Sequence, residues 1–291
     1  MISKYFATLA LFLSCLNCSF SFHTQLRVGP PLTTFSGLLS HRRDVLTAAG
    51  IVGTMCLFPS TSSAATKPSK VLVLGSTGLI GSEVSKKLSR LDISFIGTST
   101  DGRGGTEVLR ITDDSSSLAR FREIADVVKP DAIISCIGSF NDDLDYEINS
   151  FTGLIAEAFP SIPITYISVA PEVMAAVDGS PILNKYMRGK NFSNDRVGEE
   201  GLIRPTFVYG GESFGVNPPR VTSSYGRLIE KILSSGLVRG TAAISPGLIK
   251  VALEPPISAE NVAGAAVAKC LGATGNASTH DEINELAKKL N

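Results

Sequence analysis

A short apolar run followed by evenly spaced glycines is the strongest constraint on how this chain folds. The segment KVLVLGSTGLIG occupies residues 70–81. Its apolar part predicts a buried strand, and residues 79–91 have the spacing of a helix. In such a unit Gly75 allows the sharp turn, Gly78 lets the backbone approach a pyrophosphate, and Gly81 lets the helix pack on the strand. We therefore expect a dinucleotide at the helix N-terminus, contacted by Gly75, Thr77, Gly78, Leu79, Ile80 and Gly81.

Further apolar runs, separated by stretches with helical spacing, predict the rest of the sheet. The runs are KVLVLG, ISFIGT, EVLRI, DAIISCIG, ITYISVA and LIRPTFVYG. Continuous β-branched runs are typical of strands that are buried on both faces. Because strands alternate with helices, we expect an α/β fold with a doubly wound parallel sheet, an NAD(P)-binding Rossmann fold. Residues 66–210 form its expected core and residues 211–291 a small C-terminal substrate region that packs back on it, with the Pro/Gly-rich segment 210–219 as boundary.

Composition and cysteine usage exclude several classes of function. The 291 residues carry no net charge, and the first 65 are basic, so the remainder is slightly acidic and indicates no nucleic-acid partner. Only Cys136 and Cys270 lie beyond residue 65. Two cysteines in apolar surroundings provide neither a disulfide framework nor a metal cluster, so we expect no metal.

Residues 1–65 read as a targeting leader rather than as part of the fold. An apolar run behind Lys4 ends in small-x-small spacing, which predicts a signal peptide cut after Ser21. The acid-free, Ser/Thr-rich stretch 22–40 has the composition of a transit peptide. Together these two parts resemble the plastid leaders of algae with complex plastids.

A twin arginine follows directly. Arg42 and Arg43, an apolar stretch and the small residues 63–65 resemble a thylakoid twin-arginine signal. The expected location is the plastid, in the thylakoid lumen or associated with the thylakoid, with a mature chain that starts near Thr66. The alternative is that the apolar stretch belongs to the transit peptide or lies on a membrane surface.

The motifs beyond residue 70 resemble the extended and atypical short-chain dehydrogenase/reductase superfamily. The resemblance covers about residues 70–290 and is carried by VLVLGSTGLIG, YEINSFTGLIAEA, ISVA, KYMRGK, LIRPTFVYG and PPISAENVAGAAVAKCL. It is nearest to the group that holds the nucleotide-binding accessory subunit of respiratory complex I and the coenzyme Q biosynthesis accessory proteins, which has plastid relatives. The resemblance implies a bound nicotinamide dinucleotide.

Four residues are the candidates for catalysis. Tyr186 and Lys190 are four residues apart, so on a helix they share a face. We expect the Lys190 ammonium to lower the pKa of Tyr186 toward neutrality and to hold the nicotinamide ribose, so that the phenol exchanges a proton with a carbonyl oxygen. Ser168, after the fifth strand, would bond the same oxygen, and Asn149 would hold Lys190 through water. The alternative is a Tyr–Lys pair that arose by chance or that only binds ribose.

The choice between NAD and NADP is expected at the end of the second strand. An acid there binds the ribose hydroxyls of NAD, whereas an arginine accommodates the additional phosphate of NADP. This chain offers both, in Asp101 and Arg103. Arg103 and the hydroxyls of Thr98 and Ser99 favour NADP, whereas a solvated loop without contact is the alternative. Asp113, after the third strand, fits an adenine contact or an exposed loop acid.

The C-terminal part predicts two helices. Ser258 is the expected N-cap of one of them. The other runs from Thr279 to Leu290 and places one apolar face against the core, formed by Ile283, Leu286, Ala287 and Leu290.

These features predict an NAD(P)-binding protein that acts on a prenylquinone or another apolar carbonyl. A dinucleotide and either a small apolar substrate or a protein complex are the expected partners. A non-catalytic nucleotide-binding accessory protein of a thylakoid or quinone-biosynthesis complex is the first alternative. A nucleotide-sugar epimerase is the second, and the lack of an arginine-rich grip on a sugar phosphate disfavours it.

Overall fold

The computed structural model describes residues 68–113, 115–140, 143–176, 183–210, 223–244 and 247–290. These belong to one compact unit, Ala64–Asn291. The expected leader at residues 1–65, with Ser21, Arg42 and Arg43, and almost all of the expected boundary segment lie outside the described residues. Within the described part of the chain, none of the helices has both the length and the apolar character needed to cross a membrane.

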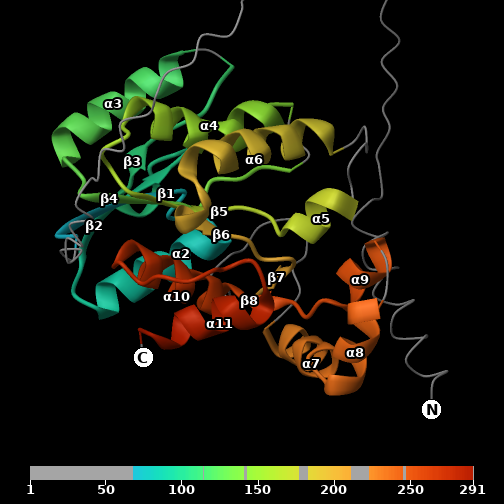
Figure 1. Ribbon diagram of the computed structural model, residues 1–291. Coiled ribbons are helices and arrows are strands. Elements are labelled where there is room, and N and C mark those ends of the chain that lie inside the picture. Colours follow the sequence, from blue (N-terminus) through green and yellow to red (C-terminus); the bar gives the residue numbers. More distant parts are fainter. Residues whose placement is uncertain are drawn as a thin grey trace, which may run out of the picture. The chain divides into compact units, whose positions relative to one another are not determined.

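A six-stranded parallel sheet with the order β3-β2-β1-β4-β5-β6 forms the centre of the unit (Figure 1). Its strands are β1 Lys70–Leu74, β2 Ser94–Ser99, β3 Glu107–Val108, β4 Ala132–Ser135, β5 Ile164–Ile167 and β6 Leu202–Ile203. This order, which reverses between β1 and β4, is that of the doubly wound Rossmann fold. The predicted fold class is confirmed.

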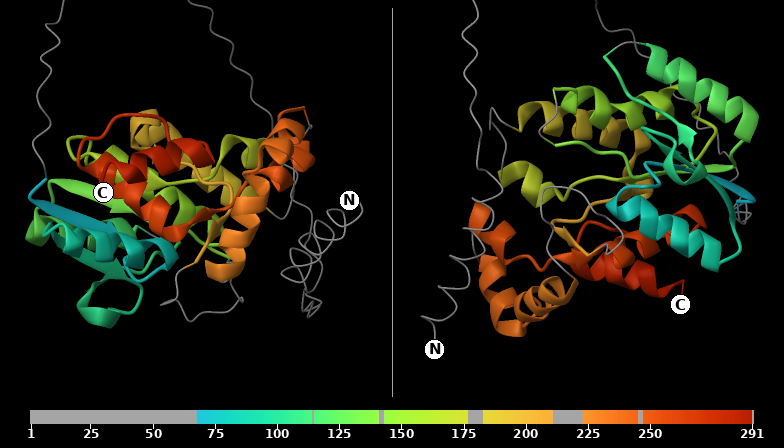
Figure 2. Two further views of the ribbon diagram at one scale, coloured as in Figure 1. Left: turned by 90° about the horizontal axis from the view of Figure 1, so that it is seen from below. Right: turned by 180° about the vertical axis from the view of Figure 1, so that it is seen from behind.

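Helices cover both faces of the sheet (Figures 1 and 2). One layer contains α2 (Leu79–Arg90), α10 (Ala259–Cys270) and α11 (His280–Lys288), and the opposite layer contains α3 (Ser116–Val128), α4 (Asp145–Ala158) and α6 (Asn184–Val197). The remaining helices are α5 (Pro171–Ala176), α7 (Ser223–Leu233), α8 (Gly236–Ile244) and α9 (Gly247–Leu253). Because α10 and α11 complete a layer of the core, the helices beyond residue 211 that stand outside the layers are α7–α9 (Figure 1).

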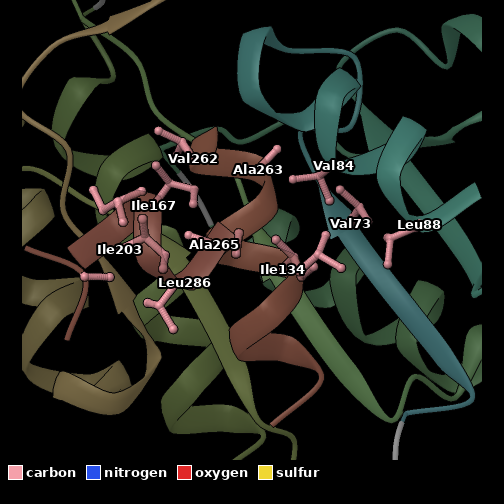
Figure 3. Close-up of a cluster of buried hydrophobic side chains, with 14 of the residues drawn as sticks. Val73, Val84, Leu88, Ile134, Ile167, Ile203, Val262, Ala263, Ala265 and Leu286 are labelled. Carbon is pink, nitrogen blue, oxygen red and sulfur yellow. The ribbon is translucent and has the colours of Figure 1, made fainter. Parts of the chain in front are cut away.

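Strand β1 shows why both layers are required. Val71 and Val73 pack in the cluster formed with α2, α10 and α11, part of which appears in Figure 3. Leu72 and Leu74 point to the other face and pack against α3 and α4. Successive side chains of a strand point to opposite faces, so a continuous apolar run is buried only between two layers.

Two predicted strands are shorter than their apolar runs. The run EVLRI forms only the two-residue edge strand β3: Leu109 N still donates to Ser99 O, and the chain then leaves the ladder. The run LIRPTFVYG is divided at Pro205, which has no N–H to donate to a sheet. Its second half forms β7 (Val208–Tyr209), which pairs with β8 (Ile257–Ser258) in a separate two-stranded sheet.

The predictions for the C-terminal helices are confirmed. Ser258 caps α10 by accepting a hydrogen bond from Asn261 N at 3.1 Å. Thr279 and Glu282 form a reciprocal capping box at the start of α11. The expected apolar face of α11 is buried through Ile283, Leu286 and Ala287, and Leu290, just beyond the helix, packs against the same core.

Candidate functional site

The glycine loop between β1 and α2 has the tight geometry that its sequence predicts. Gly75 has a φ of +71°, which favours glycine, and its carbonyl accepts a hydrogen bond from Gly78 N at 3.0 Å. A Cβ on Gly81 would lie 2.1 Å from Gly75 O, so this glycine lets the helix approach the loop backbone rather than the strand. Gly78 begins α2 without a side-chain cap, which leaves the first N–H groups of the helix for an anion.

Thr98 and Ser99, the last two residues of β2, use their hydroxyls in hydrogen bonds to neighbouring loops. Thr98 Oγ1 accepts a hydrogen bond from Gly75 N, and its carbonyl accepts from both N and Oγ of Ser76. Ser99 Oγ accepts from Gly102 N at 2.8 Å and bonds the Thr106 hydroxyl. Both side chains are buried, so they shape the loops around the expected ribose site.

Ser76 and Gly97 are a pair that the sequence reasoning missed. A Cβ on Gly97 would lie 2.2 Å from Ser76 Oγ, so β2 needs a glycine where the loop touches it. A glycine inside a strand was the available signal, because it marks a close approach of another backbone or side chain.

The two residues expected to discriminate between NAD and NADP are paired with each other. Arg103 Nε lies 3.1 Å from Asp101 Oδ1, and both side chains are about half exposed. The backbone N–H of Arg103, followed by its guanidinium, lowers the pKa of Asp101 below its ordinary value. Asp113 lies exposed in a bend ahead of α3, where both of its expected roles remain open.

Close packing of α4 on α6 brings the catalytic candidates together. A Cβ on Gly189 would lie 2.8 Å from Asn149 Cβ and from Tyr146 O, and a Cβ on Gly153 would lie 2.7 Å from the Phe192 ring. Two glycines thus allow the helices to approach. Tyr186 and Lys190 both lie on α6, as predicted, and Asn149 lies on α4.

Lys190 is buried between the ends of two strands. Its side chain is 3% exposed, and its Nζ donates to Ile167 O at 3.1 Å and to Ile137 O at 3.4 Å. The Nζ also lies 4.6 Å from the centroid of the Tyr166 ring. Burial lowers the pKa of Lys190 from 10.5 to about 7.

The expected effect of Lys190 on Tyr186 is wrong for this structure. Burial, followed by the charge of Asp145, raises the pKa of Tyr186 to about 12. The Lys190 Nζ lies 5.8 Å from the centroid of the Tyr186 ring and donates to backbone carbonyls instead. A lysine whose own pKa is near 7 is only partly protonated at neutral pH, so it provides less positive charge to stabilise a phenolate than expected.

Asn149 and Ser168 each present a buried polar atom without a partner. Asn149 Nδ2 donates to Ser139 O at 2.8 Å and to Asp145 O at 2.7 Å, whereas its Oδ1 has no hydrogen-bond partner among the described residues. Ser168 Oγ, directly after β5, likewise has none among them. Buried polar atoms are costly unless satisfied, so both positions fit a water or a ligand. Their contacts with Lys190 and with a substrate oxygen stay predictions.

A second polar network joins α7 to the body of the unit. Tyr209 donates to one oxygen of Glu230, and His280 Nε2 lies 2.7 Å from the other. Burial lowers the pKa of His280, but hydrogen bonds to Glu230 and Asp281 outweigh it and leave the pKa above 6.5. A surface pocket of ≈ 460 Å³ lies beside this network and is lined by parts of α2, α7 and α10, including Arg227.

Comparisons with known proteins match the chain to solved structures only. No family model and no curated protein matches it. It is similar to WbmH of Bordetella bronchiseptica in complex with NAD⁺, with 17% identity, a TM-score of 0.47 and coverage of 76% of this chain and 79% of that chain. It is also similar to UDP-glucose 4-epimerase of Thermus thermophilus in complex with NAD, with 15% identity, a TM-score of 0.47 and coverage of 76% and 82%.

A short-chain dehydrogenase/reductase superfamily protein from Agrobacterium tumefaciens with bound NAD is similar as well, with 16% identity, a TM-score of 0.44 and coverage of 76% and 81%. Since sequence identity is low throughout, the fold assignment rests on the strand order and on the glycine loop.

Proposed function

We propose that this protein is an NAD(P)-dependent oxidoreductase of the short-chain dehydrogenase/reductase type that reduces an apolar carbonyl compound, such as a prenylquinone. One observation carries the proposal: the glycine loop, Ser168 and the Tyr186–Lys190 pair lie at the carboxyl edge of one parallel sheet. Ligands of open parallel sheets bind at this edge, where the strand order reverses.

The residues at this edge fit a dinucleotide. The N–H groups at the start of α2 face the end of the glycine loop and suit a pyrophosphate. Lys190 lies at the ends of β4 and β5, where it can donate to a ribose hydroxyl, and the unpartnered Asn149 Oδ1 offers an acceptor for a bridging water. When bound, a reduced nicotinamide supplies the hydride that carbonyl reduction requires.

Tyr186 is protonated at neutral pH, because burial and the charge of Asp145 raise its pKa to about 12. The phenol can therefore donate a hydrogen bond to a carbonyl oxygen, and Ser168 Oγ would donate a second one. Transfer of the proton leaves a phenolate, which burial disfavours, so turnover in either direction requires that the bound dinucleotide and substrate lower the pKa of Tyr186.

A non-catalytic accessory role is the second candidate, and the same phenol supports it. Tyr186 lacks an activating cation, and Asp145 raises its pKa further. In this alternative Lys190 and Tyr186 bind ribose without turnover.

Two measurements test the proposed function. Native mass spectrometry of the purified protein should reveal a co-purified dinucleotide and identify it. Calorimetry should then show NAD(P)H binding to the wild-type protein and none to Gly78→Asp, because the new carboxylate meets the pyrophosphate at the closest backbone approach. Equal affinity of both proteins would refute the site.

A turnover screen separates the two candidates. A short-chain quinone should be reduced by wild type and by the control Tyr225→Phe on α7, whereas Tyr186→Phe should lose most of kcat with its dinucleotide affinity intact. Full activity of Tyr186→Phe would refute the proton-donor role. Dinucleotide binding without turnover of quinones or of UDP-glucose would favour the accessory role.

The location proposed for the protein rests on its sequence alone. We propose that residues 1–65 direct it into a plastid and that Arg42 and Arg43 direct its folded form across the thylakoid membrane. Replacing both arginines by lysine should leave the chain in the stroma with its leader uncut. A wild-type mature N-terminal peptide that retains Arg42 would refute the lumen assignment.

A further inference from the structure

Phe140 is an exposed aromatic residue beside the candidate proton donor. Its side chain is 47% exposed, although most large apolar side chains of the described residues are buried. Its ring lies edge-to-face with Tyr186, with centroids 5.8 Å apart and an interplanar angle of 82°. Aromatic rings attract each other in this geometry, so the contact sets how the phenol is presented.

The candidate site residues themselves hold the segment that leads to Phe140. This segment follows β4, and Asn149 Nδ2 donates to the carbonyl of Ser139, the residue just before Phe140. Lys190 Nζ donates to Ile137 O two residues earlier. Two buried residues of the candidate site, Asn149 and Lys190, therefore also hold the segment that carries the exposed ring.

Isolated exposed apolar residues are common on protein surfaces and need no function. Val127 on α3 is such a residue, with 82% exposure. Phe140 differs in two respects: its neighbour is the candidate proton donor, and its segment is tied to the site by two hydrogen bonds. An exposed, positioned ring at this place suits a planar ligand whose carbonyl reaches Tyr186.

We propose that Phe140 is a substrate-contacting residue whose exposed ring packs against a planar, conjugated ring carbonyl, a quinone or an aryl ketone, and so selects this class over aliphatic carbonyls. The inference rests on the proposed function and deepens it. The nicotinamide is also a planar ring, so the two sources of such a ring must be distinguished by experiment.

The absence of tryptophan from the chain allows a direct binding test. Phe140→Trp introduces a single tryptophan at the proposed contact, which can be excited selectively over the tyrosines, and Val127→Trp introduces a matched tryptophan on α3. An alkylated benzoquinone with a short tail should quench Phe140→Trp saturably and Val127→Trp only weakly and in proportion to its concentration. Equal quenching of the two variants by the quinone would overturn the proposal. It would also be overturned if NADP⁺ alone quenched Phe140→Trp saturably and the quinone caused no further quenching.

A kinetic comparison provides the second test. Phe140→Ala should raise KM for the benzoquinone about five- to tenfold, in line with the loss of one aromatic contact. Phe140→Tyr should restore it, and KM for an aliphatic aldehyde should change little. An equal rise for both substrates would overturn the selectivity.

Failure of this inference is distinguishable from failure of the proposed function. If calorimetry shows no dinucleotide binding to wild type, the proposed function fails. If the dinucleotide binds and the two tryptophan variants respond alike, only the role of Phe140 fails.

Discussion

Replacing Lys190 by methionine should remove a large pH dependence from the stability of this protein. In the folded chain burial brings the pKa of Lys190 to about 7, against 10.5 ordinarily. Between these two values the unfolded chain binds a proton that the folded chain does not. The free energy of unfolding therefore rises with pH in this window, by about 1.4 kcal/mol per pH unit. From about pH 7.5 to 9.5 the wild type should gain roughly 3 kcal/mol relative to the variant.

Urea unfolding of the ligand-free protein measures this difference. Wild type, Lys190→Met and the surface control Lys86→Met would be compared at matched pH, so that the titration of other groups cancels. The Lys86 side chain is 47% exposed, and this control should follow wild type. Methionine has a similar length but loses the hydrogen bonds to Ile137 O and Ile167 O. That loss lowers the variant's free energy of unfolding by the same amount at every pH, so it does not change how this free energy depends on pH.

Parallel curves for wild type and Lys190→Met would refute the reasoning. They would mean that Lys190 keeps its proton in the folded protein despite its burial. In that case Lys190 would be a cation in the ligand-free site and would lower the pKa of Tyr186.

Three further predictions follow from the same contacts. Gly189→Ala should force α4 and α6 apart, lower the free energy of unfolding by about 1–3 kcal/mol and weaken dinucleotide binding. The control Gly240→Ala should have none of these effects, because a Cβ there meets no described atom within 4 Å. Asp101→Asn should release Arg103 and strengthen NADP binding relative to NAD binding, measured as the ratio of the two dissociation constants. An unchanged ratio would show that the pair does not discriminate between the two cofactors. Because the folded pKa of His280 is raised, His280 should stabilise the protein fully below about pH 6.5 and lose this contribution as the pH rises through its folded pKa. In thermal unfolding, His280→Gln should therefore destabilise the protein more at low pH than at high pH.

The doubly wound parallel sheet and the glycine loop were predictable because each follows from a requirement visible in the residues. A strand such as β1, apolar at every position after Lys70, is stable only between two layers of helices. The glycines of the loop are needed where a Cβ would overlap backbone atoms, and Gly81 shows this at 2.1 Å from Gly75 O. Steric requirements of this kind leave a mark at fixed sequence positions.

The electrostatic state of the site was not predictable in the same way. The spacing of Tyr186 and Lys190 indicates a shared helix face, but their pKa values depend on how much water is excluded and on which carbonyls lie nearby. The hydroxyls of Thr98 and Ser99 also illustrate this limit. They are the right groups for a ribose, yet in the fold Thr98 Oγ1 accepts a hydrogen bond from Gly75 N of the glycine loop and Ser99 Oγ accepts one from Gly102 N.

The charges of the site restrict which substrates it suits. Burial lowers the pKa of Lys190 and raises the pKa of Tyr186, and each shift favours the uncharged form of the side chain. The charge of Asp145, which raises the pKa of Tyr186, would also repel an anion. An uncharged carbonyl, such as that of a quinone or an aryl ketone, brings no charge to desolvate beside these two groups. The same desolvation that leaves the phenol protonated therefore favours an uncharged carbonyl beside it, and the exposed ring of Phe140 provides an apolar surface for such a ligand.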